Sequence, residues 1–399
     1  MSLPRALHLA VALDGTGWHP ASWREERARP SGLFTARYWT DLILEAERGL
    51  IDFVTIEDSM GLQSSLLNEP DDRIDQVRGR LDAVLIAARV APLTAHIGLV
   101  PTATMSHTEP FHISKAIATL DFVSNGRAGW RAQLSRPYED SLFGRRETSA
   151  FDVQDYQKPE VQAALAERFN EALDFVEVVR RLWDSWEDDA EIRDVPTGRF
   201  IDREKLHYID FEGRCFSVRG PSIVPRPPQG QPLVTVLAHG SIPHRFGARS
   251  ADVVYVTPRN AAHAKALTQT IAVERDAAGR EDETVHVFGD LVVFLDETST
   301  AAADRKARLD ELAGYEYESD ALIFIGTPSE LADELLDLQA AGLTGFRLRP
   351  GAIPDDLYAI TRVLVAELQH RGAFRTEYHL GSLRDRLGLP RPVNRYVGA

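Results

Sequence analysis

Short, β-rich apolar runs alternate with longer segments of helical periodicity along this chain, and no other feature constrains its fold as strongly. Eight runs are predicted to be strands, at residues 7–13, 52–56, 97–100, 127–132, 233–237, 252–256, 285–295 and 344–348. Eight strands separated by helices is the composition of a closed parallel barrel of the α/β class, the single (β/α)8 or TIM barrel. An open doubly wound sheet is the alternative. The barrel is favoured because the repeat continues without the long connection that reverses strand order in an open sheet.

Helix signals fill the intervals between the predicted strands. The segment 38–49 carries apolar residues at helical spacing and ends at Gly49, a residue type common just after a helix. Thr327 followed by Pro328 predicts the start of another helix, because threonine caps helix N-termini and proline suits the first helical position. A last helix is expected over 355–369.

Two segments interrupt the repeat, and both are interpreted as insertions into one domain that spans residues 1–399. Residues 136–160 are polar and irregular. A loop of that length in a compact domain is usually a lid, a binding loop or a disordered segment, and we predict a lid or variable loop there. Residues 201–231 contain two β-rich runs around Glu212-Gly213-Arg214, which predicts a hairpin.

The composition is typical of a soluble globular protein, with 44% hydrophobic and 26% charged residues. No run of about 18 apolar residues is present, so no membrane span is expected. The first residues lack the long apolar core of a secretory signal, and the cytoplasm is the expected location. A lone cysteine, Cys215, cannot form an internal disulfide. The formal charge of -15 argues against nucleic acids and anionic membranes as partners.

Several familiar catalytic motifs are absent from the sequence. The histidines are scattered, and none pairs with a carboxylate in a recognisable metal motif, so no metal site is predicted. No Gly-x-Ser-x-Gly elbow or Walker sequence is present, and no Gly-x-Gly-x-x-Gly follows a predicted strand. The chain therefore shows no dinucleotide-binding fingerprint, and we do not expect it to take electrons directly from NADH or NADPH.

Polar clusters follow the first three predicted strands, at the ends where barrel enzymes place their chemistry. His19 lies in the loop 14–24 between two tryptophans, where it is either a catalytic acid, base or substrate contact or a packed rim residue. Asp58 follows the second strand as either a ligand-binding carboxylate or a helix cap. Thr104 follows the third, where its hydroxyl can bond a ligand; threonine is also simply a common strand residue.

The fifth predicted strand leads through Gly240-Ser241 into a helix. A glycine followed by a serine at a helix N-terminus offers free backbone N–H groups, a hydroxyl and the positive end of the helix dipole. The alternative is an ordinary capped helix start. This junction is the strongest candidate for a phosphate-binding site in the chain.

A series of short motifs in the third and fourth strand–helix units carries a family resemblance. They are Glu109-Pro110-Phe111-His112-Ile113-Ser114-Lys115, then Ala118-Thr119-Leu120-Asp121, then Ser124-Asn125-Gly126-Arg127-Ala128-Gly129-Trp130. In this order they resemble the signature of the bacterial-luciferase-like flavin-dependent monooxygenases. The branch that is most similar acts on nitrilotriacetate, dibenzothiophene sulfone and long-chain alkanes. The resemblance covers nearly the whole chain.

The resemblance implies a function and a set of site residues. It implies an FMN-dependent monooxygenase that receives reduced FMN from a separate NAD(P)H:flavin reductase and uses O2 to oxygenate a small organic substrate. A homodimer or homotetramer is expected. The positions that match the family are His19 toward the substrate, Asp58 and Thr104 against the flavin, and Gly240 and Ser241 at its phosphate.

Two positions depart from the family pattern. Where relatives read His-x-x-Arg-Tyr, this chain has Leu165 and Phe169 in place of the His and Tyr that help to hold the flavin. Losing two hydrogen-bond donors is expected to weaken FMN binding by about 1–3 kcal/mol unless they are replaced. Arg131, at the end of the fourth strand, is the candidate replacement, because a permanent cation can bond a phosphate or a flavin carbonyl. The alternative is that Arg131 pairs with a carboxylate of the loop 136–160, such as Glu139 or Asp140.

Two other functions stay open on the sequence alone. One is a deazaflavin-dependent oxidoreductase of the same superfamily, which transfers hydride and does not activate oxygen. The other is a non-catalytic flavin-binding protein, which the missing His and Tyr suggest. Oxygen consumption with reduced FMN separates the monooxygenase from the first, and flavin retention without turnover would support the second.

Overall fold

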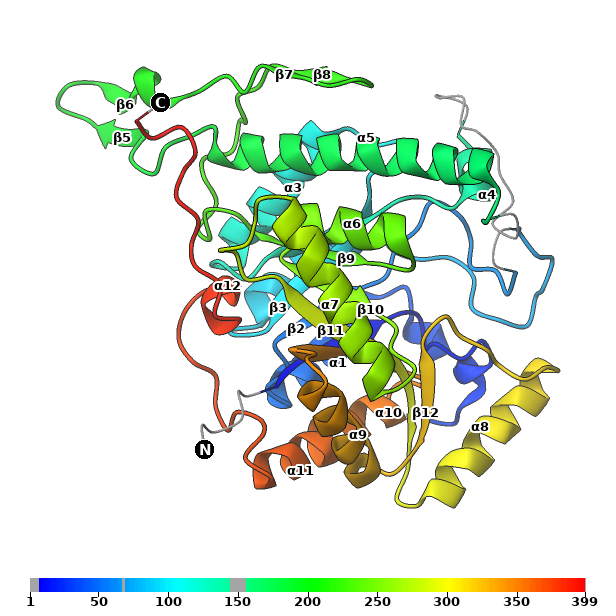
Figure 1. The fold of residues 1–399 in the computed structure, drawn as a ribbon. Coiled ribbons are helices and arrows are strands. Elements are labelled where there is room, and N and C mark those ends of the chain that lie inside the picture. Colours follow the sequence, from blue (N-terminus) through cyan, green and yellow to red (C-terminus); the bar gives the residue numbers. More distant parts are fainter. Residues whose placement is uncertain (1–6, 67–68, 144–155, 399) are drawn as a thin grey trace.

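Eight parallel strands close into a barrel in the computed structural model, which describes residues 7–66, 69–143 and 156–398 (Figure 1). In barrel order the strands are β1 (His8–Leu13), β2 (Phe53–Ile56), β3 (Gly98–Thr104), β4 (Gly129–Gln133), β9 (Leu233–Leu237), β10 (Val253–Val256), β11 (His286–Leu295) and β13 (Gly345–Pro350). Parallel pairing of β13 with β1 closes the ring. The predicted fold class is confirmed, and each of the eight predicted runs contains or overlaps one barrel strand.

One further strand of the same sheet, β12 (Leu322–Gly326), is absent from the prediction. The ten-residue β11 pairs with β10 through its amino half and with β12 through its carboxyl half. Most of β12 is only partly buried, and one face of it is open to solvent. The strand β12 therefore extends the sheet at the carboxyl end of the barrel, on one side. It is not one of the eight strands that form the closed ring.

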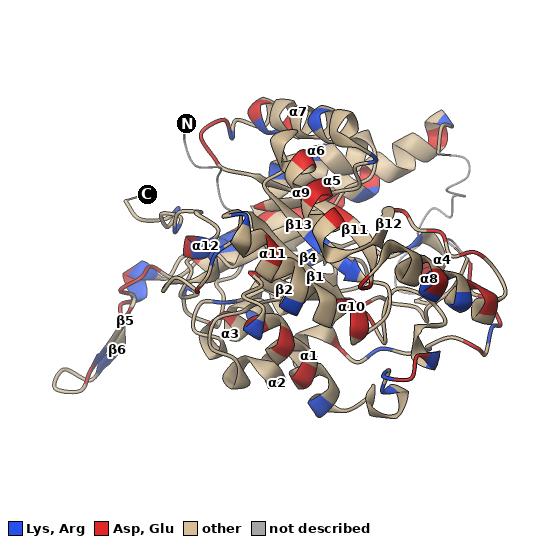
Figure 2. Ribbon diagram, turned by 90° about the horizontal axis from the view of Figure 1, so that it is seen from below, with Lys and Arg blue, Asp and Glu red and all other residues tan. Residues whose placement is uncertain are grey.

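Helices surround the barrel, most of them on its outside (Figure 2). They are α1 (Ala36–Arg48), α2 (Ala83–Val90), α3 (Pro110–Val123), α4 (Pro137–Asp140), α5 (Pro159–Asp184), α6 (Ser241–Ser250), α7 (Ala261–Ala277), α8 (Ser299–Ala313), α9 (Pro328–Ala340), α10 (Asp355–Tyr358), α11 (Val365–His370) and α12 (Leu383–Arg386). Short 3-10 turns lie at Ser22–Arg24, Pro30–Gly32, Ala91–Leu93 and Arg203–Lys205, and a π-helix at Ala359–Leu364 joins α10 to α11. Among the described helices, none is both long and apolar enough to cross a membrane.

The helix signals in the sequence hold at both α9 and α1. Thr327 caps α9 and forms a capping box with Glu330, as threonine before proline predicts. Gly49 does follow α1, but its φ of -78° is not left-handed. A Cβ at Gly49 would lie 2.6 Å from the Cβ of Thr361 in the π-helix, so close packing requires this glycine. The left-handed residue is the next one, Leu50, with φ 57°.

The amino ends of the barrel strands enclose an apolar layer. Phe53, Leu233 and Val253 are the first residues of their strands, and all three are fully buried. They pack in one cluster with Leu383 and Leu387 of the segment around α12. This C-terminal segment therefore closes the amino end of the barrel, which leaves the carboxyl end as the open side.

The two predicted insertions contain little regular structure of their own. Within 136–160 the structure has the short α4 and the start of α5, and residues 144–155, the middle of the predicted lid, lie outside the described part. Within 201–231, β7 (Phe211–Glu212) pairs antiparallel with β8 (Ser217–Val218), which confirms the predicted hairpin. A second small antiparallel pair, β5 (Glu191–Asp194) with β6 (Arg199–Ile201), follows α5 and ends at the first residue of this insertion. Figure 1 shows both pairs at the edge of the molecule, apart from the barrel strands.

Candidate active site

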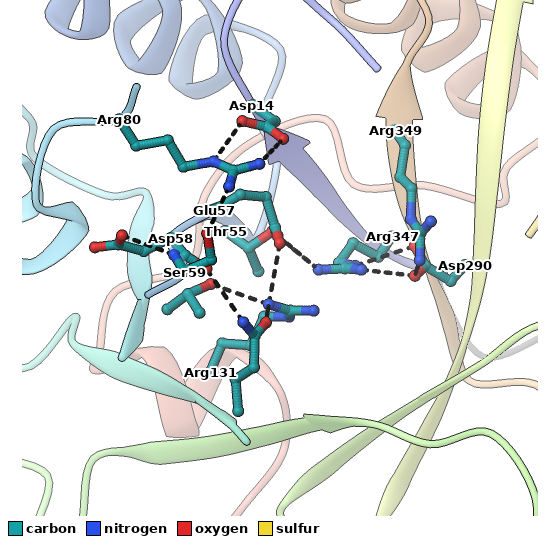
Figure 3. A network of polar contacts seen from close by, with 12 residues as sticks. Asp14, Thr55, Glu57, Asp58, Ser59, Arg80, Arg131, Asp290, Arg347 and Arg349 are labelled. Carbon is teal, nitrogen blue, oxygen red and sulfur yellow. Dashed lines mark hydrogen bonds and ion pairs between the residues drawn. The ribbon is translucent and has the colours of Figure 1, made fainter. Parts of the chain in front are cut away.

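Charged side chains fill the barrel interior above the apolar layer (Figure 3). Arg131 on β4 and Arg347 and Arg349 on β13 lie among two carboxylates, Glu57 after β2 and Asp290 on β11. These five residues are each at most 8% exposed. Buried charges are costly unless they are paired, so the geometry of the pairing decides whether this layer is stable.

Each carboxylate in this layer bridges two arginines. Asp290 accepts two hydrogen bonds from Arg347, at 3.0 and 2.6 Å, and a third from Arg349. Glu57 contacts Arg347 at 3.1 Å through one oxygen and Arg131 at 3.0 Å through the other. Although burial opposes ionisation, the charges of Arg347 and Arg349 lower the pKa of Asp290 below its usual value. The layer is thus a continuous ionic network that links β4, β2, β13 and β11.

Arg131 has a partner that the sequence did not indicate. It contacts Glu57 and donates to the Thr102 hydroxyl at 3.1 Å, whereas Glu139 accepts the N–H of Arg136 and Asp140 contacts Arg168 of α5. The alternative pairing with Glu139 or Asp140 is therefore wrong. Burial lowers the pKa of Arg131, and its Nε has no hydrogen-bond partner among the described residues. Contact between Arg131 and a flavin stays a prediction.

Asp58 and Thr104 lie at the carboxyl ends of neighbouring strands. The Asp58 carboxylate accepts N–H bonds from Ser59 at 2.8 Å and from Ala83, the first residue of α2, at 3.0 Å. Asp58 therefore supports the start of α2, and burial raises its pKa. Thr104 is the last residue of β3, is 6% exposed and pairs in register with Gln133 of β4. The flavin contacts of Asp58 and Thr104 stay predictions.

The junction at Gly240-Ser241 has the shape of an anion-binding helix start. Gly240 precedes α6 with a φ of 84°, and no side chain caps the helix. A Cβ at Gly240 would lie 2.7 Å from the Tyr156 hydroxyl. That hydroxyl is buried and has no hydrogen-bond partner among the described residues. Backbone N–H groups, the exposed Ser241 and the Tyr156 hydroxyl thus surround one place where a negatively charged group would be well bound.

His19 is completely buried, and both of its ring nitrogens are occupied. Nε2 lies 3.0 Å from the Asp310 carboxylate on α8, and Nδ1 accepts the Ala21 N–H at 3.1 Å. The ring packs against Tyr317, with the ring centres 5.1 Å apart. Burial lowers the pKa of His19, although Asp310 acts in the opposite direction. In this geometry His19 bridges the loop after β1 to α8, and its role as acid, base or substrate contact stays a prediction.

Phe169 of α5, one of the two positions that depart from the family pattern, makes apolar contacts. Phe169 is half-buried and packs edge-on against Phe246 of α6, with the ring centres 5.3 Å apart. Leu165, one turn earlier, is also half-buried. The hydroxyl that reaches the Gly240 junction comes instead from Tyr156, before α5 begins.

Several residues of this end of the barrel escape prediction from the sequence. Arg347 and Arg349 alternate in β13, and Asp290 interrupts an otherwise apolar stretch of β11. Charges at inward positions of a barrel strand are a usable signal, since such positions are otherwise apolar. Tyr156 carries no such signal, because only the folded chain brings it to Gly240.

Comparison with known proteins places the chain in a family. The sequence profile of the luciferase-like monooxygenases matches residues 16–320. N-acetyl-S-(2-succino)cysteine monooxygenase of Bacillus subtilis (strain 168) is 30% identical over 99% of both chains. Nitrilotriacetate monooxygenase component A of Aminobacter aminovorans is 28% identical, also over 99% of both. The chain therefore belongs to the luciferase-like monooxygenase family, and it is an enzyme of the monooxygenase class.

A solved structure agrees with this assignment at the level of the fold. Riboflavin lyase, in a crystal structure with a modified FMN and its substrate riboflavin, superposes with a TM-score of 0.84 and 23% identity. The match covers 98% of both chains. The described chain therefore has a counterpart along nearly its whole length in one known architecture.

The bridge made by His19 predicts a pH-dependent loss of stability. Because burial lowers the folded-state pKa of His19, the unfolded chain binds the extra proton, and stability should fall as pH drops below about 6.5. His19→Asn leaves a short polar side chain near Ala21 but removes the bond to Asp310. We expect it to lower the free energy of unfolding by about 1–3 kcal/mol at pH 7.5.

Urea unfolding of the wild type and of His19→Asn between pH 5.5 and 8 measures both effects. The difference between the two proteins should shrink toward pH 5.5, because the wild type loses its advantage there. Equal stability of the two proteins at pH 7.5 would contradict the bridging role. His370→Asn is the matched control, since this histidine is exposed in the last turn of α11.

Proposed function

We propose that the protein is a two-component, FMN-dependent monooxygenase that uses reduced FMN and O2 to oxygenate a small organic substrate. The observation that carries the cofactor assignment is the uncapped start of α6 at Gly240-Ser241, with the unpartnered Tyr156 hydroxyl against it. This start lies at the carboxyl end of β9, on the side of a barrel where such enzymes bind their ligands.

The residues at this junction fit the phosphate of FMN. A phosphate needs several donors and a positive field, and the first N–H groups of α6 supply both. Ser241 adds an exposed hydroxyl, and Tyr156 supplies a further donor in place of the one that Phe169 lacks. The absence of a Cβ at Gly240 keeps the Tyr156 hydroxyl close to the backbone. These three residues would hold the phosphate, with Asp58 and Thr104 placed to meet the rest of the flavin.

Reduced FMN, when bound, supplies the electrons and the site at which O2 is activated. The protein's task is to orient the cofactor and the substrate and to keep water away from them. The buried network of Arg131, Glu57, Arg347 and Asp290 suits this task, because each of its charges is already paired inside the barrel. This layer is a rigid polar surface inside the barrel, below the carboxyl ends of the strands.

The electrons are expected to come from a second protein. The sequence contains no dinucleotide-binding fingerprint. The relative from Aminobacter aminovorans is itself named as component A of a monooxygenase. A separate flavin reductase that delivers reduced FMN is therefore part of the proposal, with a homodimer or homotetramer as the proposed assembly.

A negative charge at the start of α6 should repel the phosphate of FMN. Ser241→Asp is expected to weaken FMN binding at least about tenfold, because a carboxylate would replace a hydroxyl at the phosphate position. Fluorescence titration of the apoprotein with FMN measures the dissociation constant. Ala261→Asp adds the same charge to the first residue of the next helix, α7, and should leave FMN binding unchanged. Equal affinity of wild type and Ser241→Asp for FMN would remove the phosphate assignment.

Oxygenation should depend on a separate reductase. The protein alone should not oxidise NADH at an appreciable rate, and addition of a flavin reductase, FMN and a substrate should produce an oxygenated product. Nitrilotriacetate and N-acetyl-S-(2-succino)cysteine are the first substrates to test, because similar enzymes are named for them. Mass spectrometry should find one atom from 18O2 in the organic product.

Two controls make this measurement decisive. Reductase and FMN without the protein measure the oxygen that free reduced FMN consumes, and Ser241→Asp should give little product at limiting FMN. Rapid NADH oxidation by the protein alone would overturn the two-component scheme. Hydride transfer from a reduced deazaflavin without 18O incorporation would favour the deazaflavin alternative instead.

A further inference from the structure

A second group of polar residues surrounds His107, in the loop between β3 and α3. His107 has a φ of 58°, in the left-handed region that side chains with a Cβ seldom adopt. Its side chain is only 4% exposed. Residues in such conformations persist where the surrounding structure holds them, and they cluster at functional sites. His107 also follows the carboxyl end of β3 by three residues, on the catalytic side of the barrel.

Asp140 determines which nitrogen of His107 carries the proton. The Nε2 atom lies 3.0 Å from the Asp140 carboxylate, which also contacts Arg168 at 2.8 Å and the Ser135 hydroxyl. A carboxylate accepts hydrogen bonds, so Nε2 is the protonated nitrogen of the neutral ring. The lone pair of the neutral imidazole is therefore on Nδ1.

The Nδ1 atom is buried and has no hydrogen-bond partner among the described residues. His107 lines a cavity of about 60 Å³ together with Met105, Leu134 and Phe175, which are apolar, and with Asp140, Arg168 and Glu171. This volume exceeds that needed for one water molecule, so a small polar group fits. A buried acceptor without a partner costs stability unless a ligand satisfies it. The arrangement of a carboxylate, an oriented imidazole and a free lone pair is that of a catalytic base.

We propose that His107 is a catalytic base of the oxygenation proposed above, and that it acts on substrates whose reactive group carries an N–H or O–H proton. The substrate X–H bond breaks, its electron pair stays on X, and the proton moves to Nδ1. The imidazolium formed is balanced by the Asp140 carboxylate at Nε2. Asp140 is then a positioning residue. A saturated hydrocarbon, which offers no such proton, gains nothing from this site.

The competing explanation is that the hydrogen bond between His107 and Asp140 has only a structural role. In that case the bond from His107 to Asp140 only fastens α4 to the loop after β3, and the free nitrogen has no partner in turnover. The charged and titratable groups that line the cavity around the ring are Asp140 on α4 and Arg168 and Glu171 on α5. A pH effect must therefore be assigned to His107 itself, which requires a spectrum of this ring.

Long-range 1H–15N NMR of the full-length protein labelled with 15N-histidine tests the proton position without turnover. His107→Asn assigns the His107 signals, because asparagine also tolerates a left-handed backbone. The expected result is a protonated Nε2, an unprotonated Nδ1, and a change at Nδ1 when the substrate binds. A proton on Nδ1 in the neutral ring would overturn the proposal. If His107→Asn fails to fold, sequential assignment of the wild-type spectrum identifies the His107 signals instead.

Steady-state kinetics distinguish a catalytic His107 from a purely structural one. They use a reductase and a substrate that the wild type oxygenates. His107→Asn should lower kcat at least a hundredfold, change KM by less than threefold and remove the acidic limb of the pH profile. FMN binding should stay within twofold of the wild type. Asp140→Asn should lower kcat by a smaller factor and shift the acidic limb. His112→Asn, an exposed histidine of α3, should behave as the wild type.

The outcomes distinguish this inference from the proposed function. If His107→Asn keeps the kcat and the acidic limb of the wild type, and the wild type incorporates 18O, then His107 is not the base. The proposed monooxygenase function stands in that case. Incorporation of 18O only into substrates that lack an N–H or O–H proton overturns the base and leaves the monooxygenase in place. Absence of 18O incorporation into every substrate tested with the reductase overturns the proposed oxygenation, and the base with it.

Discussion

The carboxyl half of the barrel depends on one buried ionic network. Asp290 and Glu57 together neutralise much of the charge of three arginines that point into the ring, and none of these residues could stay buried alone. Removing Glu57 would leave the Arg131 guanidinium without a carboxylate partner among the described residues. Because the network connects β2, β4, β11 and β13, the positions of the strand ends above it are set by the same contacts.

The strand ends carry the proposed chemistry, whereas the family motif in the third and fourth units has a structural role. Asp121 of that motif is fully buried and accepts the N–H bonds of Ala128 and Gln229, at 3.1 and 3.0 Å. Burial raises its pKa to about 6 even though these bonds act against the shift. Arg127 is tied to backbone carbonyls of the turn before β3. The motif thus fixes how α3, β4 and the segment before β9 meet.

The fold could be predicted from the sequence because strands of a closed parallel barrel are buried on both faces and appear as apolar runs. The site could be predicted only in part. Gly240 and Ser241 are recognisable as a helix start after a strand, but Tyr156 and the pair His107–Asp140 meet only through tertiary contacts. The strand β12 is partly exposed and lies outside the closed ring. A prediction that looks for the eight strands of a barrel therefore misses it. For His19 the sequence indicates a loop at the barrel mouth. It does not reveal that the imidazole ring of His19 bonds to Asp310 of α8.

The central claim is that the start of α6 holds the phosphate of a flavin, and comparison of FMN with riboflavin tests it most directly. The two molecules share the ring and ribityl chain and differ in the phosphate. Isothermal titration of the apoprotein should give a dissociation constant for FMN at least about a hundredfold below that for riboflavin, as expected for the loss of charge-assisted bonds. Ser241→Asp should reduce the preference for FMN over riboflavin, because it weakens the binding of FMN and leaves that of riboflavin unchanged. Equal affinity of the wild type for FMN and riboflavin would contradict the claim.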